Sequence, residues 1–365
     1  MKITFTCNKL GNGGAERVIS NISNQMIKDG HDVRIVCLEK FDDFYYPLDE
    51  KTEIAELDKK ISGRKNWFRR KFAGIINFIR LNKAIKGSDI VISFYTRQNC
   101  YSILACKIHK IPIICAERDH FFMYDGRVNR ILRRICYPLA DGFIHQTKMA
   151  QEYLRENCGI KCRDIVSPNP LWITDFSERK PERGFVTALG RLAEQKNYPE
   201  MIDAFALVHK QLPYAKLHIY GYGKGTEREQ LTEQIKELGL ENTVILEGLS
   251  NNVGEVLSKS EVFVMFSHGE GYPNALMEAL AYGVPAVSSD CPVGGPRDMI
   301  DDGINGFLVP CGDKAMLAER IIELLEDEEK RNVFSSNAVK IRQTNNFMKI
   351  YDGWMKYIEA VIKSA

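Results

Sequence analysis

One stretch in the second half of the chain constrains the fold most strongly. Residues 262–266 form an apolar run typical of a buried strand, and residues 275–282 have helical spacing that ends at Gly283. A glycine-bearing turn joins them. Pro273 fits the first turn of the helix, because the N–H that proline lacks would be unpaired there anyway. A strand that passes through a short turn into a helix is the repeating unit of a parallel α/β sheet.

Two carboxylates flank this turn. Glu270 lies in the turn itself, and Glu278 lies inside the helix that follows. The unpaired backbone amides at the start of a helix favour an anion such as a diphosphate. Carboxylates are strong acceptors for the hydroxyls of a sugar. The stretch therefore indicates a site for a nucleotide-sugar.

The same ten residues, Glu-Gly-x-Pro-x-x-Leu-x-Glu-Ala from Glu270, resemble the signature of retaining glycosyltransferases of family 4. The family has the GT-B fold, in which two Rossmann-like, doubly wound parallel-sheet domains face each other across a cleft. The resemblance therefore implies an α/β fold of this kind. It also implies donor contacts by Gly271, Tyr272, Pro273, Asn274, Ala275 and Leu276. The alternative is a strand–helix junction that is buried for structural reasons alone and whose two acids happen to be exposed.

Length and composition agree with two ordinary globular domains. The chain has 365 residues, 44% of them hydrophobic, and a net charge of +2, so no general preference for polyanions is expected. Its ten cysteines are scattered, which favours reduced thiols in a reducing compartment. The chain starts directly on a strand-like run, without a signal peptide, and no apolar run reaches the ~20 residues of a membrane span. We therefore expect a cytoplasmic protein.

Family motifs recur along the chain and divide it. Gly13 and Gly14 follow the first strand and resemble the first glycine loop of the family, where the backbone approaches the substrates. A dinucleotide fingerprint is the alternative, but Glu16 occupies its third glycine position. The resemblance implies an acceptor domain over residues 1–172, with a terminal helix over 346–365 crossing back onto it, and a donor domain over 173–345.

The donor domain opens with a second motif. Gly190, Arg191 and Lys196 follow a strand over 185–189 and closely resemble the family's phosphate-binding loop. Departure of a diphosphate without a metal requires positive charge that is already fixed in place. Gly221 and Gly223 follow the next strand and resemble the nucleotide-side loop. The alternative for the two cations is an exposed charged turn.

The acceptor domain offers a polar cluster. We expect a strand over 89–94, a helix over 102–109 and a strand over 111–116, followed by Glu117, Arg118, Asp119 and His120. Ligands of open α/β sheets bind at the carboxyl ends of strands. Many family members hold a histidine here, so Glu117 and His120 are catalytic candidates, and Arg97, Arg118 and Asp119 are acceptor-side candidates. A surface cluster of ion pairs is the alternative.

Residues 59–86 are strongly basic. They contain ten Lys or Arg and no Asp or Glu, interleaved with aromatic and aliphatic residues. Such a segment suits an anionic membrane surface, as for a peripheral protein at the inner face of the cell membrane. A helix that packs on its domain with a merely solvated basic face fits equally well. Nucleic acid is not expected as a partner, because no recognition module accompanies the charge.

Together these motifs predict an enzyme with named roles. The resemblance implies transfer of a sugar, with retention, from a UDP-hexose or UDP-N-acetylhexosamine to a hydroxyl of a glycan or a polyprenyl-diphosphate-linked glycan, in the synthesis of cell-surface polysaccharide. In this scheme Arg191, Lys196 and Glu270 are catalytic, Glu278 holds the ribose, and neither a metal nor another cofactor is needed. The alternative is a GT-B sugar-binding protein, or one related to the epimerases or phosphorylases.

Overall fold

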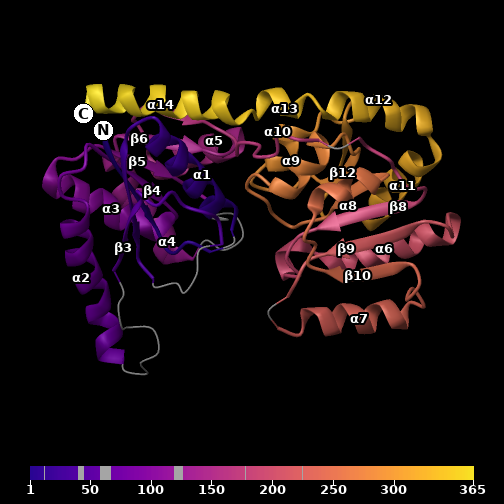
Figure 1. The fold of residues 1–365 in the computed structure, drawn as a ribbon. Helices are drawn as coiled ribbons and strands as arrows, with labels where there is room; N and C mark the ends of the chain where they lie inside the picture. Colours follow the sequence, from indigo (N-terminus) through magenta and orange to yellow (C-terminus); the bar gives the residue numbers. More distant parts are fainter. Residues whose placement is uncertain (12, 40–44, 58–66, 119–125, 177, 224) are drawn as a thin grey trace. The chain divides into compact units, whose positions relative to one another are not determined.

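The computed structural model describes residues 1–11, 13–39, 45–57, 67–118, 126–176, 178–223 and 225–365, without the side chains of 67–73. The chain forms two compact units (Figure 1). Unit 1 comprises Met1–Pro170 together with Met348–Ala365, and unit 2 comprises Leu171–Phe347. Each unit is built on its own parallel sheet, which confirms the expected α/β class.

Unit 1 contains a seven-stranded sheet in the order β3-β2-β1-β4-β5-β6-β7. Its strands are β1 (Lys2–Cys7), β2 (Asp32–Cys37), β3 (Glu53–Glu56), β4 (Ile90–Phe94), β5 (Ile113–Ala116), β6 (Gly142–His145) and β7 (Asp164–Val166). Its helices are α1 (Gly14–Lys28), α2 (Trp67–Ala84), α3 (Thr96–His109), α4 (Arg127–Cys136), α5 (Lys148–Cys158) and α14 (Phe347–Ser364). The central strands are buried along their whole length, as expected for a parallel sheet covered on both faces.

Neighbouring residues of β1 show which helix covers which face. Successive side chains of a strand point to opposite faces. Thr6 contacts Ser102 of α3, whose hydroxyl lies 2.9 Å away. Phe5 contacts Phe94, and Phe94 stacks on Trp354 of α14. Helices α3 and α14 therefore lie on opposite faces of the sheet.

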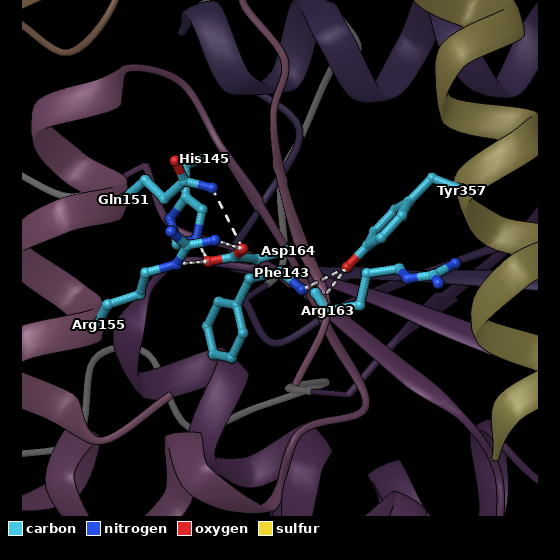
Figure 2. A network of polar contacts seen from close by, with 7 residues as sticks. All are labelled: Phe143, His145, Gln151, Arg155, Arg163, Asp164 and Tyr357. Carbon is cyan, nitrogen blue, oxygen red and sulfur yellow. Dashed lines mark hydrogen bonds and ion pairs between the residues drawn. The ribbon is translucent and has the colours of Figure 1, made fainter. Parts of the chain in front are cut away.

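The terminal helix α14 is an integral part of unit 1. Trp354 is buried, and its indole N–H donates to Ser167 at 2.9 Å. Figure 2 shows that Tyr357 of α14 reaches the far edge of the sheet, where its hydroxyl accepts from the amide of Phe143 at 2.9 Å and donates to the carbonyl of Arg163. Residues 187 to 214 positions apart thus close one core.

A charged network holds the last strand in place (Figure 2). The buried carboxylate of Asp164 on β7 lies 3.1 Å from Nε2 of His145, and it accepts from Nε2 of Gln151 at 3.1 Å and Nε of Arg155 at 2.8 Å. Burial alone would raise the pKa of Asp164, but the hydrogen bonds from His145 and Arg155 outweigh it and lower this pKa to about 2.

We expect Asp164→Asn to destabilise unit 1 by about 2 kcal/mol at pH 7, because it removes a carboxylate from a buried hydrogen-bonded pair. A carboxylate whose pKa is lowered by folding stabilises the protein above its unfolded pKa, and this contribution is lost as the pH falls toward 2. Urea unfolding at pH 7 and pH 3 tests this. The variant should lose less stability between these pH values than the wild type, whereas Glu152→Gln on the exposed side of α5 should behave like wild type.

Unit 2 contains a six-stranded parallel sheet in the order β10-β9-β8-β11-β12-β13. Its strands are β8 (Phe185–Leu189), β9 (Lys216–Tyr220), β10 (Val244–Gly248), β11 (Val262–Met265), β12 (Ala286–Ser289) and β13 (Gly306–Val309). Its helices are α6 (Tyr198–Gln211), α7 (Glu227–Glu237), α8 (Val253–Lys259), α9 (Asn274–Ala281), α10 (Gly295–Met299), α11 (Lys314–Glu326), α12 (Glu328–Ala338) and α13 (Ile341–Thr344). Helix α9 is almost fully buried, so its apolar residues form part of the core of the unit.

The structure corrects three sequence-based expectations. Helix α3 begins at Thr96 rather than Ser102, so Arg97 lies in its first turn. Helix α4 was not predicted. Pro273 is the residue before α9 rather than a member of its first turn. Across the described residues, no helix combines the length and the apolar character needed to cross a membrane.

Candidate active site

The predicted donor residues gather at the carboxyl edge of the unit 2 sheet. The direction of chain connection reverses between β8 and β11, which are neighbours in the sheet. Open α/β sheets bind ligands at such a reversal point, beyond the carboxyl ends of the strands. Gly190, Arg191 and Lys196 follow β8, and Glu270 with its neighbours follows β11. The fold therefore brings both motifs to the same place.

Two glycines, Gly190 after β8 and Gly221 after β9, bring their loops together at the base of the site. A Cβ atom added to Gly221 would lie only 1.8 Å from the carbonyl oxygen of Gly190, so the two loops approach backbone to backbone. Gly190 has φ +156°, which side chains rarely adopt, and its carbonyl accepts from the hydroxyl of Tyr198 at 3.0 Å. Close backbone packing therefore requires glycine at Gly221, and the backbone conformation favours it at Gly190.

An ion pair joins the two motifs. Nζ of Lys196 lies 2.6 Å from Oε1 of Glu270, and the two side chains are 16% and 8% exposed. The hydroxyl of Ser267 donates to the same carboxylate oxygen at 2.7 Å. Because water is largely excluded, the attraction is stronger than that of a surface pair. The cation predicted to bind the diphosphate is thus held in place by the acid predicted to orient the sugar.

Gln195 links the two loops a second time. Its side-chain amide donates to the backbone carbonyl of Gly269 at 2.6 Å, and its backbone carbonyl accepts from the amide of His268 at 2.9 Å. The loop after β11 is also fixed from the other side, where the amide of Glu270 donates to the carbonyl of Pro292 at 2.6 Å. The ion pair is therefore set in a loop region restrained on both sides.

Helix α9 begins directly after this loop. The first helical hydrogen bond runs from the amide of Met277 to the carbonyl of Pro273 at 3.1 Å. The amides that precede Met277 in the helix are not used for hydrogen bonds between its successive turns, as at every helix start. The loop after β12 comes equally near, since a Cβ on Gly295 would stand 1.9 Å from the carbonyl of Gly271. Helix α9 therefore begins at the turn for which the sequence predicts anion-binding amides.

Not every predicted donor residue presents its side chain to this edge. Leu276 is fully buried in the core. Tyr272 is also buried, and its hydroxyl interacts with the side chain of Asn345 from the end of α13, at 2.8 Å from Nδ2. Donor contacts by Tyr272 and Leu276 would therefore involve their backbone atoms. Glu278 is 8% exposed, one helical turn after Asn274, whereas Arg191 is exposed.

Gly223, two residues further along the loop after β9, is less constrained than Gly221. A Cβ on Gly223 would meet the end of the flexible Glu227 side chain at 2.9 Å rather than backbone atoms. The carboxylate of Glu227 accepts from the amide of Gly225 at 2.6 Å, just before α7 begins. A hydrogen bond therefore connects the predicted nucleotide-side loop to the first turn of α7.

Unit 1 places its glycine loop at the corresponding edge of its own sheet. Gly13 immediately precedes α1, and an added Cβ there would meet the carboxylate of Glu16. That carboxylate accepts from the hydroxyl of Tyr95 at 2.9 Å. Tyr95 follows β4 with φ +71°, an uncommon conformation for a residue other than glycine. Gly13 and Gly14 thus lie at the point where β1 and β4 diverge, beside a strained tyrosine.

Glu117 lies inside unit 1. It is 3% exposed, and its Oε2 accepts from Thr96 at 3.0 Å and from the hydroxyl of Tyr137. Burial raises the pKa of Tyr137, with the nearby Glu117 carboxylate adding to the shift. The buried Arg133 donates to Thr96 at 3.0 Å and completes this group. The carboxylate of Glu117 is committed to internal partners, so it fits a role in positioning the loop after β5 better than contact with a substrate.

Arg118 is the part of the predicted cluster best placed for a ligand. Its Nη1 donates to Asn169 at 2.7 Å, and its Nε and Nη2 have no hydrogen-bond partner in the part of the chain that the structure describes. Burial lowers the pKa of its guanidinium to about 10, so it is a cation at neutral pH. Arg97 is exposed and lies 3.5 Å from Asn129. Asp119 and His120 lie outside the described residues.

Sequence reasoning missed several residues that order these loops. Ser267 and Gln195 flank the predicted motifs, and their polar side chains next to Glu270 and Lys196 were the available signal. Tyr95 and Asn169 lie at the ends of strands in unit 1, where polar side chains are often functional. Their partners are far away in sequence, so no local pattern identifies them.

Comparison with known proteins shows the family of the chain. Residues 173–341 match the family described as glycosyl transferases group 1, and residues 12–171 match glycosyltransferase family 4. The chain is 29% identical, over the full length of both proteins, to the Campylobacter jejuni GalNAc-alpha-(1->4)-GalNAc-alpha-(1->3)-diNAcBac-PP-undecaprenol alpha-1,4-N-acetyl-D-galactosaminyltransferase. It is 32% identical to an uncharacterised glycosyltransferase of Methanocaldococcus jannaschii, over 75% of this chain and 80% of that protein.

The fold has equally clear counterparts. The structure of Anabaena HepE in complex with UDP matches 99% of this chain and all of that chain, with a TM-score of 0.80 and 19% identity. Two parallel-sheet α/β units that match these two family models define a GT-B nucleotide-sugar enzyme. The chain belongs to glycosyltransferase family 4, the retaining glycosyl transferases of group 1.

Proposed function

We propose that the enzyme transfers a sugar from a UDP-hexose or UDP-N-acetylhexosamine to a glycan hydroxyl on a polyprenyl-diphosphate carrier, at the inner face of the cell membrane. The observation that carries the donor half is the pair of Lys196 and Glu270 beside the first amides of α9. A cation and a helix start together form a strong site for a diphosphate. Unit 2 is therefore proposed as the donor unit and unit 1 as the acceptor unit.

In this proposal each donor residue has a distinct task. Lys196 and Arg191 stabilise the negative charge that develops on the leaving diphosphate, and the amides near Asn274 add their dipoles. Glu278 accepts hydrogen bonds from the ribose hydroxyls. Glu270 keeps the ammonium of Lys196 at the reaction centre and offers its remaining acceptor capacity to the sugar. These cations supply the charge that a metal would otherwise provide, so turnover should not require an added metal.

The relatives support the chemistry of both substrates. The name of the Campylobacter jejuni relative describes transfer of N-acetylgalactosamine to a glycan on undecaprenyl diphosphate. The HepE structure contains UDP. Arg118, Asn169 and the glycine loop at Gly13 and Gly14 are the proposed acceptor-side groups of this chain, because they share one edge of the unit 1 sheet. The basic segment 59–86, of which residues 59–66 lie outside the described part, is proposed to contact the anionic membrane.

A donor panel tests this function. The purified enzyme is incubated with UDP-, GDP-, ADP- and dTDP-sugars and a polyprenyl-diphosphate-linked glycan, without added metal, and the released nucleotide is measured. We expect selective release of UDP. Glu278→Gln should weaken the binding of free UDP by about tenfold or more, because it removes a charged acceptor from the ribose. Binding of UDP without turnover of any donor would favour a sugar-binding protein, and preference for another nucleotide would reject the proposed donor.

A further inference from the structure

The outer surface of unit 1 has an unusual composition where α2, α3 and α4 lie next to one another. In residues 74–84, α3 and α4 together, sixteen side chains are exposed, and every one is either a large apolar residue or Lys or Arg. The nine apolar ones are Ile75, Ile76, Ile79, Tyr101, Leu104, Ile108, Val128, Ile131 and Ile135. The seven basic ones are Arg80, Lys83, Arg97, Lys107, Arg127, Arg130 and Arg134. We call this surface the three-helix face.

These three helices form one continuous surface. Helix α3 packs against α2 on one side and α4 on the other, and it covers the sheet over β4 and β5 (Figure 1). Phe78 of α2 meets Tyr101 of α3 with ring centroids 6.4 Å apart. Right-handed connections between parallel strands place the helices that lead to β4, β5 and β6 on the same face of the sheet. Their outward sides therefore point to the same solvent region.

The pattern on α4 is reversed relative to an ordinary surface helix. Val128, Ile131 and Ile135 are 57–62% exposed, whereas Arg133 is buried against Thr96. Surface helices normally bury the apolar stripe and expose the polar one. The neighbouring helix α5 is ordinary in this respect, since its exposed residues include Glu152 and Glu156 among basic ones. The apolar and basic character thus ends at α4.

We infer that the three-helix face docks on an anionic lipid bilayer. Exposed isoleucines can enter the boundary between headgroups and acyl chains, and the surrounding Lys and Arg pair with anionic headgroups. No acidic residue occurs in α2, α3 or α4 to oppose this attraction. The inference extends the contact proposed for residues 59–86 to α3 and α4. The purpose of the docking rests on the proposed lipid-linked acceptor, but the experiment that tests the docking does not use that acceptor.

Vesicle flotation tests the docking without any acceptor. The full chain should float with phosphatidylcholine vesicles that contain about 30% phosphatidylglycerol, bind pure phosphatidylcholine weakly, and lose binding at high salt. Ile131→Ser/Ile135→Ser should weaken binding by about tenfold or more. Arg127→Gln/Arg130→Gln should weaken it by about fivefold for each charge removed. Leu249→Ser, at a residue of unit 2 that is 67% exposed, is the matched control and should bind like wild type.

The outcomes separate this inference from the proposed function. Release of UDP from the donor, measured without vesicles, should be unchanged in all three variants, which also shows that they are folded. Binding by the wild type that the α4 variants leave intact would reject α4 as part of the docking surface. Absence of binding to anionic vesicles would overturn the whole inference. A dimer in solution that Ile131→Ser/Ile135→Ser dissociates would likewise overturn it, since the face would then pair with a second copy.

Discussion

Replacing Lys196 with alanine is expected to slow turnover by more than about a hundredfold at saturating donor. Removal of a fixed cation from a developing negative charge costs about 3 kcal/mol of barrier. Steady-state release of the nucleotide measures the effect. Lys314→Ala, which removes a cation from an exposed pair with Asp203 in the same unit, is the matched control and should leave the rate unchanged.

The double variant Lys196→Ala/Glu270→Gln separates two causes of this loss. In the single variant the buried carboxylate of Glu270 loses its cation and would repel a diphosphate. If repulsion were the main effect, neutralising Glu270 would restore most of the rate. We expect the double variant to remain within a few-fold of the single one, because the missing cation is the main defect. Turnover of Lys196→Ala within a few-fold of wild type would disprove the assignment.

Gly221→Ala is expected to destabilise unit 2 by about 3 kcal/mol and to abolish the binding of UDP. The added methyl group would lie 1.8 Å from the carbonyl oxygen of Gly190, which is backbone and cannot move aside without shifting the loop after β8. Urea unfolding and titration with UDP measure the two effects. Gly353→Ala is the control, because an added Cβ there meets no atom within 4 Å. Normal stability and UDP binding in Gly221→Ala would contradict the close approach.

The parts of the fold that the sequence predicts well are those encoded locally. The strand over 262–266 and the helix after it carry a buried apolar run and a helical period, so both appear as β11 and α9. Helix α4 escapes the same reasoning because its isoleucines face outward and Arg133 faces inward. Helix α3 starts earlier than the apolar pattern predicts because Thr96, Gln98 and Asn99 are polar yet buried.

In the candidate site, too, locally encoded features are predicted and long-range contacts are not. The motif residues at Gly190, Lys196 and Glu270 could be identified because each follows directly after a recognisable strand. The contact between Lys196 and Glu270 could not be derived, since 74 positions separate them. Glu117 was grouped with exposed polar residues, whereas Thr96 and Tyr137, about twenty positions away on either side, draw its carboxylate inward. Long-range partners decide which polar residue is exposed.

The placement of α14 affects the order in which the protein can be completed during synthesis. The ribosome delivers the seven strands of unit 1 first, then all of unit 2, and only afterwards the helix that carries Trp354 and Tyr357. Until then the face of the first sheet around Phe94 lacks its cover. Unit 2 can fold from one uninterrupted segment, so the unit that begins the chain is the last to be finished. For most of its translation the nascent chain therefore exposes an incomplete apolar surface of unit 1, and such surfaces favour aggregation.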